Sequence, residues 1–261
     1  MEIAGKKEFS NGAVYCLKLK DGMLIETTDT FLPFYTKNAI GKHQNFLKDE
    51  NLGSRKERYM IGVSVMSGCP IRCKFCATGQ MKKWRNLTAQ EIVEQVMFVI
   101  EKNKDIDPSK SQEFKINYTR MGDFGLNVEN VKEAIRRITS LYSNTHHYVS
   151  TIGIKDADFS WIKDNITLQV SLHSLEDEKR NWLIPYKKKM TISELGKIKT
   201  FSNLKTTLNM TLVDESDFNI DKLKENFDKD NFFIKLSPIN PNEVSNNNHL
   251  GEGVIEGVNL K

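Results

Sequence analysis

Apolar residues recur along most of the chain in two patterns, as short apolar runs and as longer stretches with a helical period. The short runs, which predict buried strands, are residues 59–67, 114–120, 147–151, 166–172, 205–213 and 232–236. The stretches with a helical period are residues 127–142, 155–163, 175–183, 191–202 and 218–228. Strands separated by helices indicate βαβ units and a parallel sheet with right-handed crossovers. We therefore predict an α/β fold in which about six strands form a partial (β/α)6 barrel instead of a closed eight-stranded one.

One further helix is marked by the residues at its start. Thr88 precedes an apolar stripe within residues 92–99, and Glu91 follows Thr88 by three positions. This spacing predicts a capping box, in which each of the two side chains accepts a hydrogen bond from the backbone N–H of the other residue.

The first 58 residues follow a different pattern. Two alternating runs, residues 13–19 and 23–29, flank an Asp-Gly step and predict a β-hairpin extension. Cys16 lies in the first run, where a small strand residue is the simplest interpretation. Residues 35–58 are polar and basic, which favours a solvated loop or frayed helix, with a phosphate-contacting patch as the alternative. We expect an N-terminal hairpin and basic linker at 1–58, a main domain at 59–241 and a loop-rich tail at 242–261.

The composition is that of a globular protein, with 39% hydrophobic and 28% charged residues. No apolar run is long enough to cross a membrane, and the start lacks the pattern of a secretory signal, so we expect a soluble, cytoplasmic protein with no membrane partner. The net charge of +4 permits nucleic-acid binding but is smaller than that of most dedicated nucleic-acid binders. Clustered cysteines favour a reducing compartment over a disulfide framework.

Three of the four cysteines, Cys69, Cys73 and Cys76, have the spacing C-x3-C-x2-C in the loop after the first main-domain strand. Thiolates are soft ligands that suit zinc and iron–sulfur clusters. A structural zinc site needs four protein ligands, and no fourth Cys or His follows within several dozen residues. A [4Fe-4S] cluster held by three cysteines leaves one iron open to S-adenosylmethionine (SAM), and the aromatic Phe75 completes the radical-SAM pattern. Zinc and a simple redox cluster remain the alternatives.

Several blocks, in order, resemble the RlmN/Cfr family of RNA adenine methyl-synthases. The blocks are CPIRCKFCATGQMKKWRNLTAQEIVEQV from Cys69, Met121-Gly122-Asp123-Phe124-Gly125-Leu126-Asn127, Ser150-Thr151-Ile152-Gly153, Ser171-Leu172-His173, and Leu236-Ser237-Pro238-Ile239-Asn240-Pro241. The resemblance extends from about residue 13 to residue 241. It implies that residues 59–241 form a radical-SAM partial barrel, and that the protein is a transferase-like enzyme. It also implies a [4Fe-4S] cluster, SAM, an external one-electron donor of the flavodoxin or ferredoxin kind, and an RNA or nucleotide substrate.

The resemblance also implies a role for individual residues. Cys69, Cys73 and Cys76 would hold the cluster, and Glu26 stands where the family carries an acidic proton acceptor. The SAM site would consist of Gly122 and Asp123 at the amino group, Ser150 at the methionyl end, Asn240 at the ribose, and Ser171, Leu172 and His173. A core histidine at His173 and a turn former at Asn240 are the structural alternatives. At Asp123 and Phe124 the chain departs from the family's Glu-Pro.

Two family cysteines have no counterpart here, since Gly62 stands at the first position and no cysteine follows Cys76. The family's N-terminal helical domain, which engages RNA, has no counterpart either. We therefore expect a radical SAM enzyme that cleaves SAM to methionine and a 5′-deoxyadenosyl radical without dual-cysteine methyl transfer. Its substrate would be an RNA adenine or nucleotide, a small molecule, or SAM itself. The alternatives are RNA methylation with a thiol from Cys16 or another chain, and a non-catalytic protein that binds the cluster, SAM and RNA.

Overall fold

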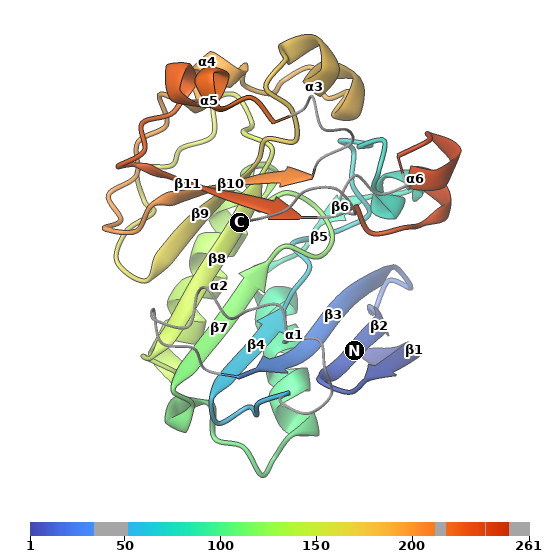
Figure 1. The fold of residues 1–261 in the computed structure, drawn as a ribbon. Helices are drawn as coiled ribbons and strands as arrows, with labels where there is room; N and C mark the ends of the chain where they lie inside the picture. The colour runs from blue at the N-terminus through green and yellow to red at the C-terminus, as the bar shows by residue number, and fades with distance from the viewer. Residues whose placement is uncertain (34–51, 212–217, 238, 251–261) are drawn as a thin grey trace. The chain divides into compact units, whose positions relative to one another are not determined.

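A computed structural model describes residues 1–33, 52–211, 218–237 and 239–250, and places them in two compact units (Figure 1). The first unit comprises Met1–Ser67, Asn86–Met121 and Glu129–Tyr148. The second comprises Gly68–Arg85, Gly122–Val128 and Val149–Lys261. Strand β8 (Thr145–Thr151) contributes residues to both units. The predicted boundaries at residues 58 and 241 divide the chain in another way and stay predictions.

The sheet of the first unit has the order β1-β2-β3-β4-β7-β8. Its strands before β8 are β1 (Glu2–Phe9), β2 (Gly12–Lys18), β3 (Leu24–Leu32), β4 (Arg58–Gly62) and β7 (Glu113–Tyr118). Strands β1 to β4 pair antiparallel, and β4 pairs parallel with β7. The predicted hairpin is therefore confirmed as β2 and β3. Strand β1 was not predicted, because nearly all of its side chains are exposed and leave no apolar alternation in the sequence.

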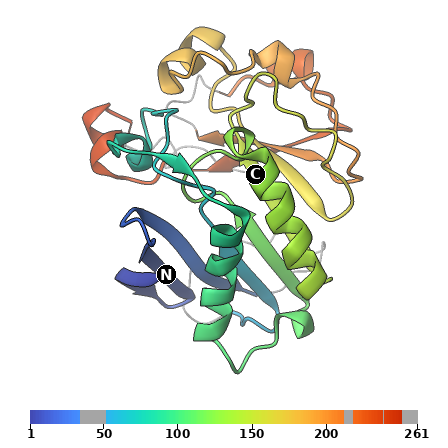
Figure 2. The same ribbon diagram turned by 180° about the vertical axis from the view of Figure 1, so that it is seen from behind.

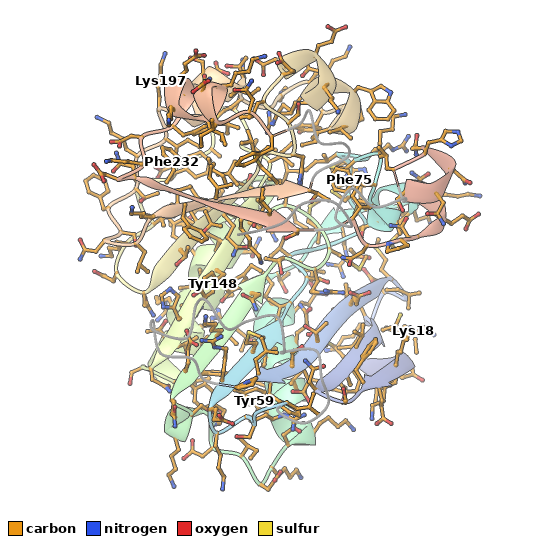
Figure 3. All side chains as sticks on the ribbon, in the orientation of Figure 1. Lys18, Tyr59, Phe75, Tyr148, Lys197 and Phe232 are labelled. Carbon is orange, nitrogen blue, oxygen red and sulfur yellow. The ribbon has the colours of Figure 1, made fainter. Side chains whose placement is uncertain are left out.

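Two long helices cover this sheet, α1 (Ala89–Lys102) and α2 (Val128–Leu141), as Figure 2 shows. Their first turns are linked, because the side chain of Asn130 accepts from the backbone N–H of Ala89 at 3.1 Å. The predicted capping box of α1 is confirmed, with Glu91 N donating to Thr88 Oγ1 at 3.2 Å and Thr88 N donating to Glu91 Oε2 at 2.9 Å. Tyr59 of β4, labelled in Figure 3, is fully buried.

The second unit continues the alternation of strands and helices. Strands β9 (Ile166–Ser171), β10 (Thr206–Thr211) and β11 (Phe232–Ser237) pair parallel in that order after β8. The α-helices are α3 (Asp177–Leu183), α4 (Ile192–Leu195), α5 (Ile220–Asn226) and α6 (Glu243–Asn247). The short remaining elements of the chain are β5 (Met66–Ser67), β6 (Arg85–Asn86), and the 3-10 turns η4 (Ala77–Gln80), η5 (Pro108–Lys110) and η6 (Phe124–Leu126).

Two predicted helices differ from the structure. Residues 155–163 form turns, because the Asp158 carboxylate accepts from Ser160 N at 2.8 Å and Asp156 adopts a left-handed backbone with φ of 67°. Local side-chain hydrogen bonds of this kind compete with a helix. The helix predicted at 191–202 is reduced to the single turn α4, which ends at Gly196.

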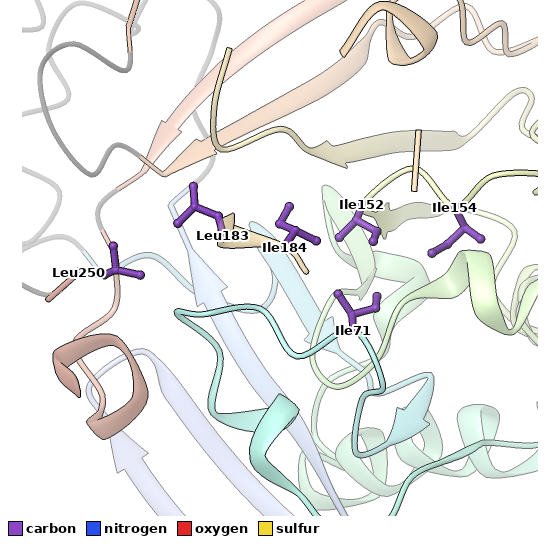
Figure 4. Packing of buried hydrophobic residues seen from close by; sticks show 6 residues of the cluster. All are labelled: Ile71, Ile152, Ile154, Leu183, Ile184 and Leu250. Atoms are coloured by element: carbon purple, nitrogen blue, oxygen red, sulfur yellow. The ribbon is translucent and has the colours of Figure 1, made fainter. Parts of the chain in front are cut away.

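The core of the second unit includes a cluster of six buried residues, which Figure 4 shows. They are Ile71, Ile152, Ile154, Leu183, Ile184 and Leu250. Partly buried residues of the cysteine loop, Cys69, Cys73 and Phe75 among them, pack against this cluster. The fold therefore places an apolar wall behind the thiols.

Candidate functional site

The cysteine loop begins at a glycine that no other residue could replace without strain. Gly68 has φ of 70°, and a Cβ on it would lie 2.3 Å from the carbonyl oxygen of Lys83 and 2.9 Å from Cβ of Trp84. The loop then turns back on itself, with Cys76 N donating to Cys73 O at 3.1 Å. This turn brings Cys73 and Cys76 close together in the loop.

Burial against the apolar wall changes the acid–base behaviour of two thiols, those of Cys69 and Cys73. Burial raises the pKa of Cys69 to about 12, against a smaller lowering by the backbone N–H of Ile71, and burial raises the pKa of Cys73 well above its ordinary value. Thiolates in such surroundings need a bound cation to offset their charge, which is what a metal or cluster supplies.

The donor set fits a [4Fe-4S] cluster. In the part of the chain that the structure describes, no group of three or more Cys, His, Asp and Glu side chains is close enough to hold one metal ion. The cysteines of a cubane cluster bind different irons, so their sulfurs do not need to converge on one point. Three soft donors from one loop, two of which (Cys69 and Cys73) pack against the apolar wall, match this requirement.

Backbone groups of the loop are held by residues far away in the sequence. Lys74 N donates to Leu183 O at 2.9 Å, at the end of α3. The side-chain amide of Asn242 donates to Phe75 O at 3.0 Å, and that of Asn248 donates to Lys74 O at 3.0 Å. The role of these two asparagines was missed from the sequence, where they look like ordinary members of an Asn-rich tail. The capping box that Asn242 forms with Ser245 was the one local signal for α6.

Gly122 and Asp123 form the next turn of the site. Gly122 has φ of 92°. The buried carboxylate of Asp123 accepts from Gly125 N at 2.8 Å and from Ile152 N at 2.7 Å, which ties this turn to the end of β8 just beyond Ser150. Burial raises the pKa of Asp123 to about 6, although hydrogen bonds from Thr151, Ile152 and Gly125 oppose the shift. The Asp123 carboxylate thus accepts hydrogen bonds from the backbone of the fold, and it is also the predicted partner of the SAM amino group.

Arg180 of α3 connects the strand ends that carry the predicted SAM residues. Its fully buried guanidinium donates to four backbone carbonyls, those of Ile152 at 2.6 Å, Met190 at 2.7 Å, Leu172 at 3.1 Å and Ser171 at 3.3 Å. Burial lowers the pKa of Arg180 to about 10, which leaves it charged at neutral pH. One side chain therefore holds the ends of β8 and β9 together.

His173 follows β9 with a left-handed backbone, φ 58°, and is buried. Its Nδ1 accepts from Thr211 N at 3.1 Å, which places the ring proton on Nε2. Burial lowers the pKa of His173 to about 3, with a further contribution from the charge of Arg180, so the ring is neutral. The ring meets that of Phe75 edge-on, with centroids 4.8 Å apart.

Asn240 is exposed, and its carbonyl oxygen accepts from the side chain of Asn242 at 3.0 Å. The same Asn242 amide holds Phe75. The second unit thus links the cysteine loop, the Asp123 turn, the ends of β8 and β9, and Asn240 in one network. Whether these residues bind SAM stays a prediction.

Glu26 lies in the first unit, on β3, where it forms an ion pair with Arg120. Cys16 faces it as the paired residue on β2. Gly62 lies nearby on β4, paired with Thr28. A Cβ on Gly62 would lie 2.3 Å from Thr28 Oγ1 and 3.0 Å from Cδ of Arg120, so a side chain at residue 62 would require the side chain of Thr28 to shift.

A pocket of about 350 Å³ lies at the amino ends of β10 and β11, where Lys197 and Phe232 are labelled in Figure 3. None of the predicted site residues lines it. Ligands of parallel sheets gather at the carboxyl ends of the strands, so this pocket is not the candidate active site. No helix in the described residues is long and apolar enough to span a membrane.

Comparison with known proteins bears on the same residues. The pattern of the Radical SAM superfamily matches residues 63–226. The probable dual-specificity RNA methyltransferase RlmN of Chlorobium phaeobacteroides (strain BS1) is 35% identical over 178 residues, which cover 66% of this chain and 49% of that protein. Its counterpart from Dictyoglomus turgidum (strain DSM 6724 / Z-1310) is 34% identical over 191 residues, 71% of this chain and 47% of the relative.

Among solved structures, a radical SAM methyltransferase from Sphaerobacter thermophilus matches with a TM-score of 0.64 and 22% identity, over 92% of this chain and 67% of that one. This match supports the predicted α/β fold with parallel strands of a partial barrel. The chain spans about half the length of the curated relatives that it matches.

Proposed function

The chain belongs to the radical SAM superfamily, and from this premise we propose that it is an RlmN-like enzyme that cleaves SAM without dual-cysteine methyl transfer. The observation that carries the second part is the closure of Gly62 by Thr28 and Arg120. A cysteine at this position would need the ion pair or the Thr28 hydroxyl to move.

Cys69, Cys73 and Cys76 are the residues that would hold the [4Fe-4S] cluster. When bound, such a cluster supplies the electron that splits SAM into methionine and a 5′-deoxyadenosyl radical. The protein contributes the apolar wall around Ile71 and Leu183, which packs against the partly buried Cys69 and Cys73. Arg180 and Asp123 fix the strand ends against which SAM would bind.

The substrate is the open part of the proposal. The relatives are named as RNA methyltransferases, which favours an RNA adenine or a nucleotide as the substrate. A one-electron carrier protein would reduce the cluster. A small molecule, or SAM itself in uncoupled cleavage, is the alternative that fits the mild net charge of +4.

A second candidate is RNA methylation with Cys16 as the thiol. The pairing of Cys16 with Glu26 across β2 and β3 favours it, because a thiol and a carboxylate stand on neighbouring strands. Replacement by serine tests this candidate directly. If Cys16→Ser methylates RNA as fast as the unmodified chain, Cys16 is not the nucleophile.

The main experiment incubates the cluster-loaded protein anaerobically with SAM and dithionite, and identifies the products by liquid chromatography and mass spectrometry. We expect 5′-deoxyadenosine without S-adenosylhomocysteine. S-adenosylhomocysteine would show that a methyl group is transferred, and would contradict the proposal. Neither product from a protein with an intact cluster would favour a non-catalytic role in binding the cluster, SAM and RNA. A Cys73→Ser variant is the control for chemistry that does not need the cluster.

A further inference from the structure

The segment that carries the three cysteines is strongly basic. Residues 68–85 contain five cationic and no acidic side chains. The cations are Arg72, Lys74, Lys82, Lys83 and Arg85. The whole chain has 38 basic and 34 acidic residues, which leaves 33 basic and 34 acidic residues outside this segment. All of the chain's positive excess is therefore concentrated on the cysteine segment.

The basic residues are presented to solvent beside the first cysteine. Arg72, Lys82 and Lys83 are exposed, and Trp84 keeps 53% of its surface accessible. Among the described residues, no carboxylate forms an ion pair with Lys82 or Lys83. Gly68 brings them close to the thiols, because its missing Cβ leaves room for the backbone of Lys83 and Trp84 directly before Cys69.

A cluster in this loop must receive single electrons from outside the protein. Electron transfer weakens steeply with distance, so a protein donor has to dock against the loop itself. Interfaces of electron-transfer pairs are small, and opposite charges guide their encounter. An exposed tryptophan that directly follows two exposed lysines in the chain provides an apolar anchor of the kind that such interfaces use.

We propose that Arg72, Lys82, Lys83 and Trp84 form the docking surface for an acidic one-electron carrier protein. The proposal rests on the proposed function, which requires such a donor. A nucleic acid is the competing partner for any basic surface, but it is usually bound along an extended positive track. Here the excess charge is confined to 18 residues around the cysteines, which suits a small protein contact better.

The test uses a bacterial flavodoxin, an acidic flavin protein, as the probe. Its dissociation constant from the cluster-loaded chain is measured by calorimetry over a series of salt concentrations. We expect Lys82→Gln/Lys83→Gln to weaken binding by about tenfold or more at low salt and to flatten the salt dependence. The matched control is Lys224→Gln/Lys229→Gln, which removes two exposed lysines at and after the end of α5 and should bind as the unmodified chain does.

A second measurement separates the docking surface from the chemistry. Cleavage of SAM is followed with reduced flavodoxin and, in parallel, with dithionite, which needs no docking surface. The double variant should lose flavodoxin-driven cleavage and keep the dithionite-driven rate. Carbodiimide cross-linking to flavodoxin should map to Lys82 and Lys83.

Three outcomes of these measurements decide on the docking surface and on the proposed function. Equal flavodoxin affinity in the double variant and the control overturns the docking surface. Unchanged flavodoxin affinity together with lost binding of an RNA oligonucleotide overturns it in favour of a nucleic-acid surface. Absence of dithionite-driven cleavage in the unmodified chain contradicts the proposed function, while a charge-dependent loss of flavodoxin binding still supports the surface.

Discussion

The guanidinium of Arg120 forms an ion pair with the carboxylate of Glu26, while the aliphatic part of the same side chain lies against Gly62. Arg120 thus contacts both Glu26, the candidate proton acceptor, and the space beside residue 62. Both members of the pair are about one-third exposed, so its contribution to stability is small, about 1 kcal/mol or less. Its consequence is geometric, because Arg120 closes the space that a side chain at residue 62 would need.

Gly62→Ala should therefore destabilise the protein. The new Cβ displaces the Thr28 hydroxyl, which accepts from Gly62 N at 3.1 Å, and we expect a loss of about 1–3 kcal/mol in the free energy of unfolding. Urea unfolding measures the effect. In a Thr28→Ala background the same substitution should cost about 1 kcal/mol less, and an equal cost in both backgrounds would show that Thr28 is not the obstacle.

Arg180→Met should have a larger effect. Methionine fills a similar space but leaves the carbonyls of Ile152, Leu172 and Met190 without their donor, at a cost of about 3–5 kcal/mol. The control is Arg136→Met on α2, whose exposed side chain pairs with Glu133 and whose loss should change stability by about 0.5 kcal/mol or less.

If Arg180 positions the strand ends of a SAM site, the variant has a second phenotype. SAM binding, measured by equilibrium dialysis at a temperature where the variant is folded, should weaken severalfold. Unchanged SAM affinity in a folded Arg180→Met protein would limit Arg180 to a structural role.

His147 makes the stability of the first unit depend on pH. Its buried ring lies between Tyr118 Oη at 3.1 Å and Thr139 Oγ1 at 2.9 Å, and burial lowers the pKa of His147 to about 3. The unfolded chain binds a proton near pH 6.5 and the folded chain does not, so stability present above pH 6.5 is lost as the pH falls toward 3. The expected slope is up to about 1.4 kcal/mol per pH unit.

Denaturant unfolding at several pH values checks this slope. His147→Gln should reduce it, with a residual slope from His146 and His173, whose pKa values burial also lowers. His249→Gln, which changes an exposed histidine, is the control and should leave the slope unaltered. A slope that does not respond to His147→Gln would assign the acid sensitivity to other groups.

Asn242→Asp tests the tether on the cysteine loop. Aspartate still accepts from Val244 N and Ser245 N and so caps α6, but it cannot donate to Phe75 O. We expect faster loss of the cluster's visible absorbance in the presence of a ferrous chelator. Asn219 caps α5 only as an acceptor, so Asn219→Asp is a matched control that should lose its cluster at the unmodified rate.

The predictions that rest on short-range sequence patterns are the ones that the structure confirms most directly. The hairpin and the capping box at Thr88 depend on residues a few positions apart, and both are confirmed. The helix predicted at 155–163 failed because periodicity does not register the turn that Asp158 forms with its neighbours. Cys69 and Cys73 pack against an apolar wall, but the wall itself is assembled from distant segments.

The residues that hold the candidate site together could not have been predicted from such short-range patterns. Asn242 and Asn248 reach partners 167 and 174 positions earlier, and nothing in their neighbourhood marks them. Arg180 lies within the helix predicted at residues 175–183, and the periodic pattern gives it no further role. Its burial among carbonyls follows from where β8 and β9 end, which a periodic pattern does not specify.

The tether by Asn242 and Asn248 also sets an order of events during synthesis. The ribosome releases the cysteine loop before residues 242–250 are made, so the loop is at first without the hydrogen bonds from Asn242 and Asn248. Leu250, which completes the apolar wall, arrives last. The two amide hydrogen bonds and the contact of Leu250 are therefore the last parts of the loop's surroundings that can form.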